Sequence, residues 1–149
     1  MGATFENLAS MTGQEMGVSE WLRIDQDRID KFAEATNDHQ WIHVNVEMAK
    51  AMLPDGKTIA HGYLTLSLIP GLTGELMQVE GVTRAINYGS NKVRFVSMVQ
   101  VGSKVRARVK LVAVEPKSGG LLMTNEVTME VEGSERPAFV AETLSLLYQ

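Results

Sequence analysis

The sequence contains no cysteine and no apolar run of the length that a membrane span requires. Without cysteine, disulfides, thiolate zinc sites and a cysteine nucleophile are excluded, and the chain suits a reducing compartment. The longest apolar stretch, Tyr63–Leu72, is interrupted by Thr65, Ser67, Pro70 and Gly71. Because a membrane-spanning helix needs about 20 apolar residues, we expect no membrane segment.

Positive charge is also scarce, with 14 Lys and Arg against 18 Asp and Glu, a net charge of −4. Proteins that bind nucleic acid rely on clustered Lys and Arg, so nucleic acid is not an expected partner. The first ten residues, MGATFENLAS, lack the basic start and apolar run of a signal peptide. These deficits predict a cytoplasmic protein with neither nucleic acid nor membrane as its partner.

The 149 residues and their 44% apolar content suit one globular domain, spanning residues 1–149. The N-terminal half has helical patterns. A short strand is expected in Glu20–Ile24, and Asp25 is a suitable N-cap for a helix over Gln26–Thr36. Asn37 can adopt the left-handed conformation that ends a helix, which leaves Asp38 in a loop.

A second short helix is expected over Val46–Met52, capped by Asn45. The most apolar segment follows as HGYLTLSLIPGLTGELM, residues 61–77. It predicts a buried helix of about 16 residues, about 24 Å long. Pro70 removes a helix hydrogen bond, so we expect a kink or an early end near it.

The C-terminal half has strand patterns. Residues 104–110 and 126–132 alternate between apolar and charged side chains, and PKSGG at 116–120 forms a turn between them. The basic stripe could bind phosphates, but a hairpin folded about Ser118 gives it an acidic partner stripe, which favours a solvated outer face. The expected pairs are Lys104 with Glu132, Arg106 with Glu130, and Lys110 with Glu126.

Two further segments, Val82–Phe95 and Ala138–Leu147, complete the strands, and Gly89 indicates a bulge in the first. The pattern therefore predicts an α+β fold, in which a largely antiparallel sheet has one long apolar helix against its concave side.

Chemistry is concentrated in TNDHQWIHVN, residues 36–45. Asp38 and His43 flank the apolar pair Trp41 and Ile42, and burial of that pair would draw both polar side chains inward. With reference pKa values near 3.9 and 6.5, an Asp and a His could hold one water and move its protons. A cap residue and a structural histidine are the alternatives. A metal site is not expected, since His39 and His43 lie on a predicted loop.

A second feature is His61-Gly62, within TIAHGYLTL, where the apolar helix begins. The first N–H groups of a helix lack partners within it, and glycine lets a substrate approach the backbone. Such an amide could bind a carbonyl oxygen that becomes enolate-like. The alternative is a helix start beside a tight turn.

Together these stretches resemble the MaoC-like dehydratases, or (R)-specific enoyl-CoA hydratases of the hydratase 2 group. The resemblance rests on Phe32 followed by residues 35–43, on Ala-His-Gly at 60–62, and on residues 86–95 and 101–107. The His-Gln-Trp-Ile-His run is most similar to the nodulation protein N-like subgroup.

The sequence departs from the family pattern in three places. Asn37 replaces a glycine, Gln40-Trp41 replaces Asn-Pro, and residues 96–100 replace a proline-rich loop. The resemblance implies a hot-dog fold, in which the sheet wraps the central helix, and a homodimer. It also implies the addition of water to a trans-2-enoyl thioester, which gives an (R)-3-hydroxyacyl thioester.

By this resemblance Asp38 acts mainly as base, His43 helps to deliver the proton to C2, and the Gly62 N–H polarises the thioester carbonyl. The remaining expected substrate contacts are Asn37, Gln40, His61 and Tyr63. No metal or redox cofactor is implied, and coenzyme A or an acyl carrier protein arrives as part of the substrate. Two alternatives remain: a thioesterase, whose usual helix acid is missing here, and a non-catalytic acyl-thioester binding protein.

Overall fold

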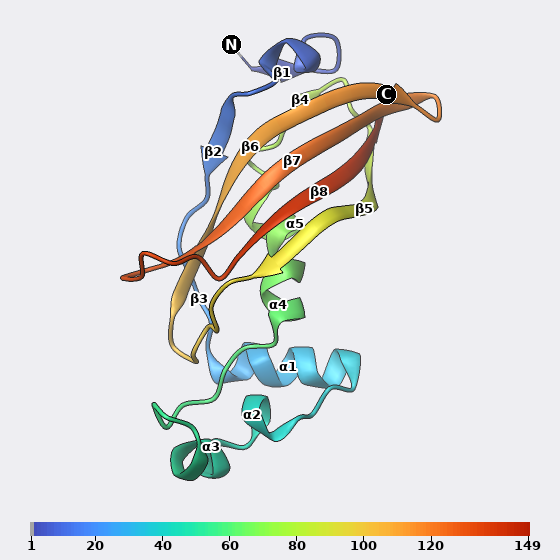
Figure 1. The fold of residues 1–149 in the computed structure, drawn as a ribbon. Coiled ribbons are helices and arrows are strands. Elements are labelled where there is room, and N and C mark those ends of the chain that lie inside the picture. Colours follow the sequence, from blue (N-terminus) through green and yellow to red (C-terminus); the bar gives the residue numbers. More distant parts are fainter. Residues whose placement is uncertain (1) are drawn as a thin grey trace.

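The computed structural model describes residues 2–149 and has the predicted α+β architecture, an antiparallel sheet with helices packed on one face (Figure 1). The main sheet has the strand order β2-β6-β7-β8-β5, and β3 also pairs with β6. The elements are β1 (Ala3–Thr4), η1 (Leu8–Met11), β2 (Glu15–Val18), β3 (Leu22–Arg23), α1 (Gln26–Thr36), α2 (Trp41–Val44), α3 (Val46–Met52), α4 (Gly62–Ser67), α5 (Ile69–Thr73), β4 (Val79–Glu80), β5 (Arg84–Phe95), β6 (Lys104–Lys117), β7 (Gly120–Val131) and β8 (Phe139–Tyr148).

The capping residues of α1 and α3 confirm the local predictions. The Asp25 carboxylate accepts a hydrogen bond from the Arg28 N–H at 2.9 Å, which starts α1. Asn37 ends the helix with φ 59° and ψ 29°, a left-handed conformation that asparagine tolerates better than most residues. The Asn45 side chain accepts from the Met48 N–H at 3.0 Å and starts α3.

The central helix differs from the single long helix that the sequence predicted. It is divided into α4 and α5, which meet at Leu68, and Pro70 lies in the first turn of α5. Proline suits the first turn of a helix because its missing N–H has no partner there anyway. The break expected near Pro70 is therefore confirmed. Leu64 of α4 is buried in the core, and Ile69 and Leu72 of α5 are partly buried against it.

The register of the long hairpin is as predicted near its open end, where Arg106 is opposite Glu130 and Lys110 is opposite Glu126. Beyond Leu111 the pairing shifts by one residue, because Val112 forms a β-bulge. The sequence showed no sign of this bulge. It bends β6, so the sheet curves around α4 and α5 (Figure 1).

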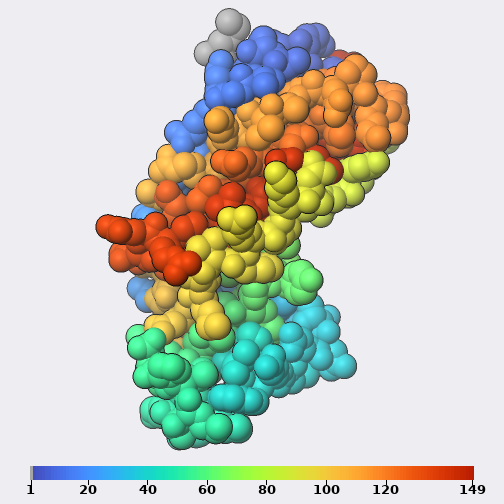
Figure 2. Space-filling model, in the orientation of Figure 1, coloured from blue at the N-terminus to red at the C-terminus, as the bar shows by residue number. Residues whose placement is uncertain are grey.

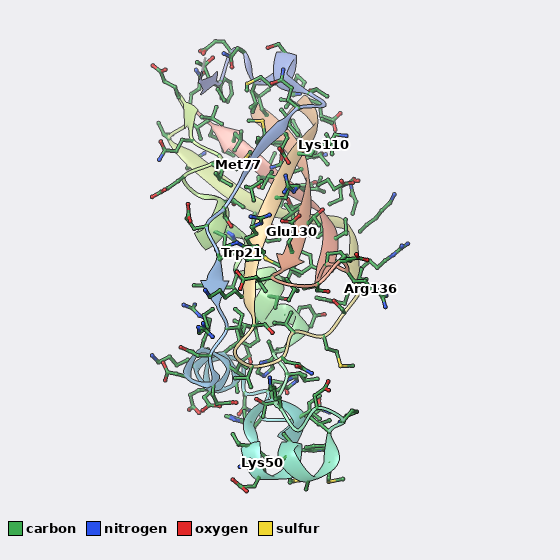
Figure 3. The ribbon with its side chains drawn as sticks, turned by 90° about the vertical axis from the view of Figure 1, so that its left-hand side faces the viewer. Trp21, Lys50, Met77, Lys110, Glu130 and Arg136 are labelled. Atoms are coloured by element: carbon green, nitrogen blue, oxygen red, sulfur yellow. The ribbon has the colours of Figure 1, made fainter. Side chains whose placement is uncertain are left out.

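The two faces of β6 have the environments that its alternation predicted. Val105, Ala107 and Val109 are fully buried against the central helix. On the outer face Arg106 binds Glu130 at 2.7 Å and lies over the Trp21 ring, so its charge has an acidic and an aromatic neighbour; Trp21 and Glu130 are labelled in Figure 3. Arg108 also binds Glu130, so the two arginines of the stripe are ion-paired on the outer surface of the sheet.

Helices α1, α2 and α3 form a separate layer at one end of the sheet, and α4 connects this layer to the sheet. Figure 2 shows the surface narrowing at this junction, between the sheet strands and the helices. Within residues 2–149, no helix has the length and apolar character needed to cross a bilayer. The sequence-predicted site residues lie at the junction, where the N-terminal end of α4 meets α1 and α2.

Candidate active site

His43 lies on the short helix α2, and not on a loop as the sequence suggested, and only 7% of it is exposed. Its Nδ1 is 2.6 Å from the Ile59 carbonyl oxygen. The backbone of His43 is also held, because the Gln26 side-chain amide donates to its carbonyl at 2.8 Å. Thr58 donates in turn to Gln26 at 2.6 Å. His43 is thus held in place through both its imidazole ring and its backbone carbonyl.

These contacts determine the protonation of His43. A carbonyl can only accept a hydrogen bond, so Nδ1 carries the proton and Nε2 keeps its lone pair. Burial lowers the pKa of His43 below its ordinary value, and the nearby His61 lowers it further. The hydrogen bond to Ile59 and the charge of Asp38 oppose this shift only in part. At neutral pH His43 is therefore an uncharged base.

Asp38 is exposed, which corrects the expectation that it would be drawn inward with Trp41 and Ile42. The left-handed turn at Asn37 directs the loop toward solvent before α2 brings the chain back inward. One Asp38 carboxylate oxygen is 3.3 Å from the Gln40 N–H. His39 is exposed as well, and its ring faces the Glu34 carboxylate at 3.8 Å, so it takes no part in the site.

Asp38 nevertheless reaches the buried histidines. One of its carboxylate oxygens and one ring nitrogen from each of His43 and His61 lie within 4.8 Å of one another. A single water that hydrogen-bonds to two acceptors can bridge about 5.6 Å, because each bond is about 2.8 Å long. The carboxylate and the imidazole are therefore close enough to share one water.

The same three groups are badly arranged for a metal ion. The His43 and His61 rings stack with their centroids 3.9 Å apart and their planes inclined by only 22°. A nitrogen lone pair lies in the plane of its ring, and both would have to meet one ion at about 2.0–2.1 Å. Nearly parallel stacked rings cannot aim two lone pairs at such a point. The arrangement favours proton chemistry over metal binding.

A cavity of about 480 Å³ adjoins the histidines at the start of α4. Gly62 lines it, and the Phe95 ring covers this glycine so closely that an added Cβ would lie 3.0 Å from Phe95 Cε1. The Gly62 N–H is the first of α4 and has no partner within the helix. The cavity wall is mostly apolar and consists of His43, Ile59, Ala60, Gly62, Tyr63, Thr65, Phe95, Val96, Ser97, Met98 and Val99.

The four expected substrate contacts have different positions. Tyr63 lines the cavity and is 70% exposed. Asn37 and Gln40 lie on the exposed loop outside the cavity wall. His61 is buried behind His43, and its Nε2 is 3.0 Å from the Asp38 carbonyl oxygen. Contact of these four residues with substrate stays a prediction.

Several residues that build the site carried no recognisable signal in the sequence. Ile59 acts through its backbone carbonyl, which any residue type could supply. Gln26 was read only as the first residue of a helix, and Phe95 only as the end of a strand. Their roles depend on contacts between segments 16 to 33 positions apart, so spacing along the chain could not reveal them.

An antiparallel sheet packed against a central helix is the hot-dog fold, which this chain shares with solved hydratases and dehydratases. Residues 7–133 match the MaoC like domain family. A 3-hydroxyacyl-thioester dehydratase Z of Mycobacterium tuberculosis is 51% identical over 145 residues, 95% of each chain. The nodulation protein N of Rhizobium leguminosarum is 44% identical over 143 residues, 95% of this chain and 89% of the relative.

Among solved structures, the (R)-hydratase from A. caviae involved in PHA biosynthesis is 25% identical, with a TM-score of 0.75. The alignment covers 92% of this chain and 96% of that one. The chain belongs to the MaoC-like dehydratase family, and it is an enzyme of the dehydratase or hydratase type.

Substitution of Asn37 separates a conformational role from substrate contact. We expect Asn37→Gly to retain stability and turnover, because glycine adopts φ 59° without strain. Asn37→Ala should lower the free energy of unfolding by about 1–2 kcal/mol, because Cβ is strained in the left-handed region. Thermal unfolding and steady-state kinetics measure both. An equal rise of KM in the two variants would instead show that the Asn37 amide binds substrate.

Gly62→Ala tests the close approach of Phe95. The added Cβ would lie 3.0–3.2 Å from three ring atoms, so the ring must move into the cavity. We expect kcat/KM to fall about tenfold, as small displacements at a reacting site typically cause. Adding Phe95→Leu should restore part of the loss, with Phe95→Leu alone as control. Full activity of Gly62→Ala would contradict the packing described.

Proposed function

We propose that this protein catalyses the (R)-specific hydration of trans-2-enoyl thioesters to (R)-3-hydroxyacyl thioesters, and the reverse dehydration. The observation that carries the proposal is the position of the Asp38 carboxylate and the His43 imidazole, within 4.8 Å of each other beside the cavity. The names of the relatives, a 3-hydroxyacyl-thioester dehydratase and an (R)-hydratase, support the same reaction and the same stereochemistry.

The water between Asp38 and His43 gives one hydrogen bond to each, because the carboxylate and Nε2 are both acceptors. Its oxygen lone pairs are then free to attack C3 of the enoyl group. As the C3–O bond forms, one proton of the water passes to the Asp38 carboxylate, which acts mainly as the base. Asp38 then releases this proton to C2 on the same face. His43 helps this delivery by holding the remaining O–H of the water at Nε2, so the elements of one water are added syn.

The negative charge that develops on the thioester oxygen needs a hydrogen-bond donor. Gly62 lines the cavity at the first position of α4, where its N–H has no helical partner. A backbone amide aimed at the developing charge typically contributes about 10²–10³-fold to the rate. Gly62 can take this role through its backbone alone, so no side chain there is required.

The cavity also suits the substrate class. Its apolar wall, with Phe95, Met98 and Tyr63 at the exposed side, fits an acyl chain better than a polar group. The carrier, coenzyme A or an acyl carrier protein, stays outside and belongs to the substrate. We assign no metal or redox cofactor, since the addition of water needs only the proton transfers described.

The paired substitutions Asp38→Asn and His43→Gln test the mechanism. Each replaces a group that can take up a proton by a neutral amide that cannot, so we expect crotonyl-CoA hydration to fall by about 10²–10⁴-fold. Loss of enoyl absorbance measures the rate, and circular dichroism checks the fold. His39→Gln is the matched control, because His39 is exposed in the same segment and should leave the rate unchanged.

Near-normal turnover by Asp38→Asn or His43→Gln would reject the assignment of the pair. Release of free thiol from acyl-CoA, without hydration of the enoyl thioester, would indicate the thioesterase alternative. Tight binding of acyl-CoA with no change in enoyl absorbance would indicate a non-catalytic binding protein.

We also propose that the protein forms a homodimer through β5. This strand pairs only with β8 within the described chain, so its other edge is open over twelve residues. It exposes Ile86 and Tyr88 by 47% and 49%, and long edges with apolar side chains are usually covered. Two copies of β5 can pair about a twofold axis, which joins the sheets of the two subunits into one continuous sheet.

Ile86→Lys should disrupt this dimer, because it places a charge on the paired face. Light scattering after size-exclusion chromatography measures the mass, and we expect a dimer for the wild type and a monomer for the variant. Val112→Lys, on the exposed bulge of β6, is the control and should stay dimeric. A monomeric wild type, or a dimer unaffected by Ile86→Lys, would contradict the proposal.

A further inference from the structure

His61 lies at the centre of the site without facing the cavity. It is 3% exposed, and the cavity wall includes its neighbours Ala60 and Gly62 but not His61 itself. One face of its ring stacks on His43 at 3.9 Å, and Phe32 of α1 is 4.9 Å away. His61 is therefore packed between Phe32 of α1 and His43 of α2, a position that leaves it little access to substrate.

The polar contact of His61 is directed at the backbone of the loop that carries Asp38. Its Nε2 is 3.0 Å from the Asp38 carbonyl oxygen, so Nε2 carries the proton. This bond joins the residue before α4 to a loop 23 positions earlier in the chain. The Asp38 N–H also donates to the Ala33 carbonyl at 3.1 Å, so the backbone of Asp38 is held from α1 on one side and from His61 on the other. The bond to His61 thus helps to restrict where the carboxylate can lie.

The second nitrogen, Nδ1, is buried and has no hydrogen-bond partner among the described residues. Since Nε2 carries the proton in its bond to Asp38, Nδ1 is the acceptor nitrogen of the ring. The titratable groups near the ring are His43 of α2 and Asp38 of the loop, and α1 offers Phe32. His39 and Glu34 face each other at the exposed surface.

We propose that His61 is a positioning residue, which holds the Asp38 loop through its Nε2–H and provides the ring surface against which His43 is oriented. The inference rests on the proposed hydratase function, since it assigns His61 a role in that same site. It replaces the sequence-based expectation of a substrate contact. A positioning role predicts an effect on turnover, whereas a substrate contact predicts an effect on binding.

Two variants separate the two contacts. His61→Phe keeps a ring for stacking but removes the N–H, and we expect kcat for crotonyl-CoA to fall about tenfold or more with KM within about twofold. His61→Gln keeps an N–H but removes the ring. Loss of the ring lets water reach the space beside His43. In this variant the midpoint of His43 titration should rise toward its ordinary value of about 6.5.

Two measurements report the midpoint of His43 titration: the pH profile of kcat/KM and an NMR titration. The acid limb of the kcat/KM profile should move to higher pH in His61→Gln, because activity is lost when His43 is protonated. In His61→Phe the burial of His43 is kept and only the lowering by the His61 ring charge is lost, so the limb should move less than in His61→Gln. Titration of the His43 ring protons by NMR measures the same midpoint without substrate. If the wild type fails to hydrate enoyl thioesters, the proposed function is wrong, whereas the NMR titration still decides whether His61 acts on His43.

Circular dichroism and thermal unfolding show which variants fold. If only one of His61→Phe and His61→Gln folds, that variant alone is enough for the test. A severalfold rise in KM, with kcat and the His43 midpoint unchanged, would overturn the proposal in favour of substrate contact. Wild-type kcat and an unchanged midpoint in every folded variant would overturn it as well. His39→Gln again serves as the control, because its ring lies outside the site.

Discussion

The hydrogen bond from His43 Nδ1 to the Ile59 carbonyl, at 2.6 Å, is the contact on which the rest of the site depends. It selects the tautomer, because a carbonyl accepts only, and leaves Nε2 as the nitrogen that can accept a hydrogen bond. It also joins α2 to the segment that leads into α4. The same bond thus fixes the tautomer of His43 and holds α2 against the start of the central helix.

Further hydrogen bonds hold both residues of this contact in place. On one side Gln26 binds the His43 carbonyl and is itself held by Thr58. On the other side the segment around Ile59 is paired with the loop after β5, through Ala60 N–H to the Val99 carbonyl at 2.7 Å. The sheet, the central helix and the helical layer therefore meet at one point, and the cavity is the space they leave there.

Burial distinguishes the two members of the pair. His43 is enclosed, and burial lowers its pKa, so its imidazole is uncharged at neutral pH and can accept a hydrogen bond. Asp38 is exposed to solvent. The proposed hydration uses this difference, with Asp38 as the main base and His43 as the group that holds the water.

The sequence by itself determined the elements and the chemical residues. Caps at Asp25 and Asn45 and the left-handed Asn37 depend on local backbone preferences, and alternation along β6 depends on which face is buried. Only the tertiary structure decided the burial of His43, the exposure of Asp38, the stacking of His61 and the roles of Ile59 and Phe95. The physical reason is that these properties belong to contacts between distant segments, and a carbonyl or a ring gains its role only from what folding places against it.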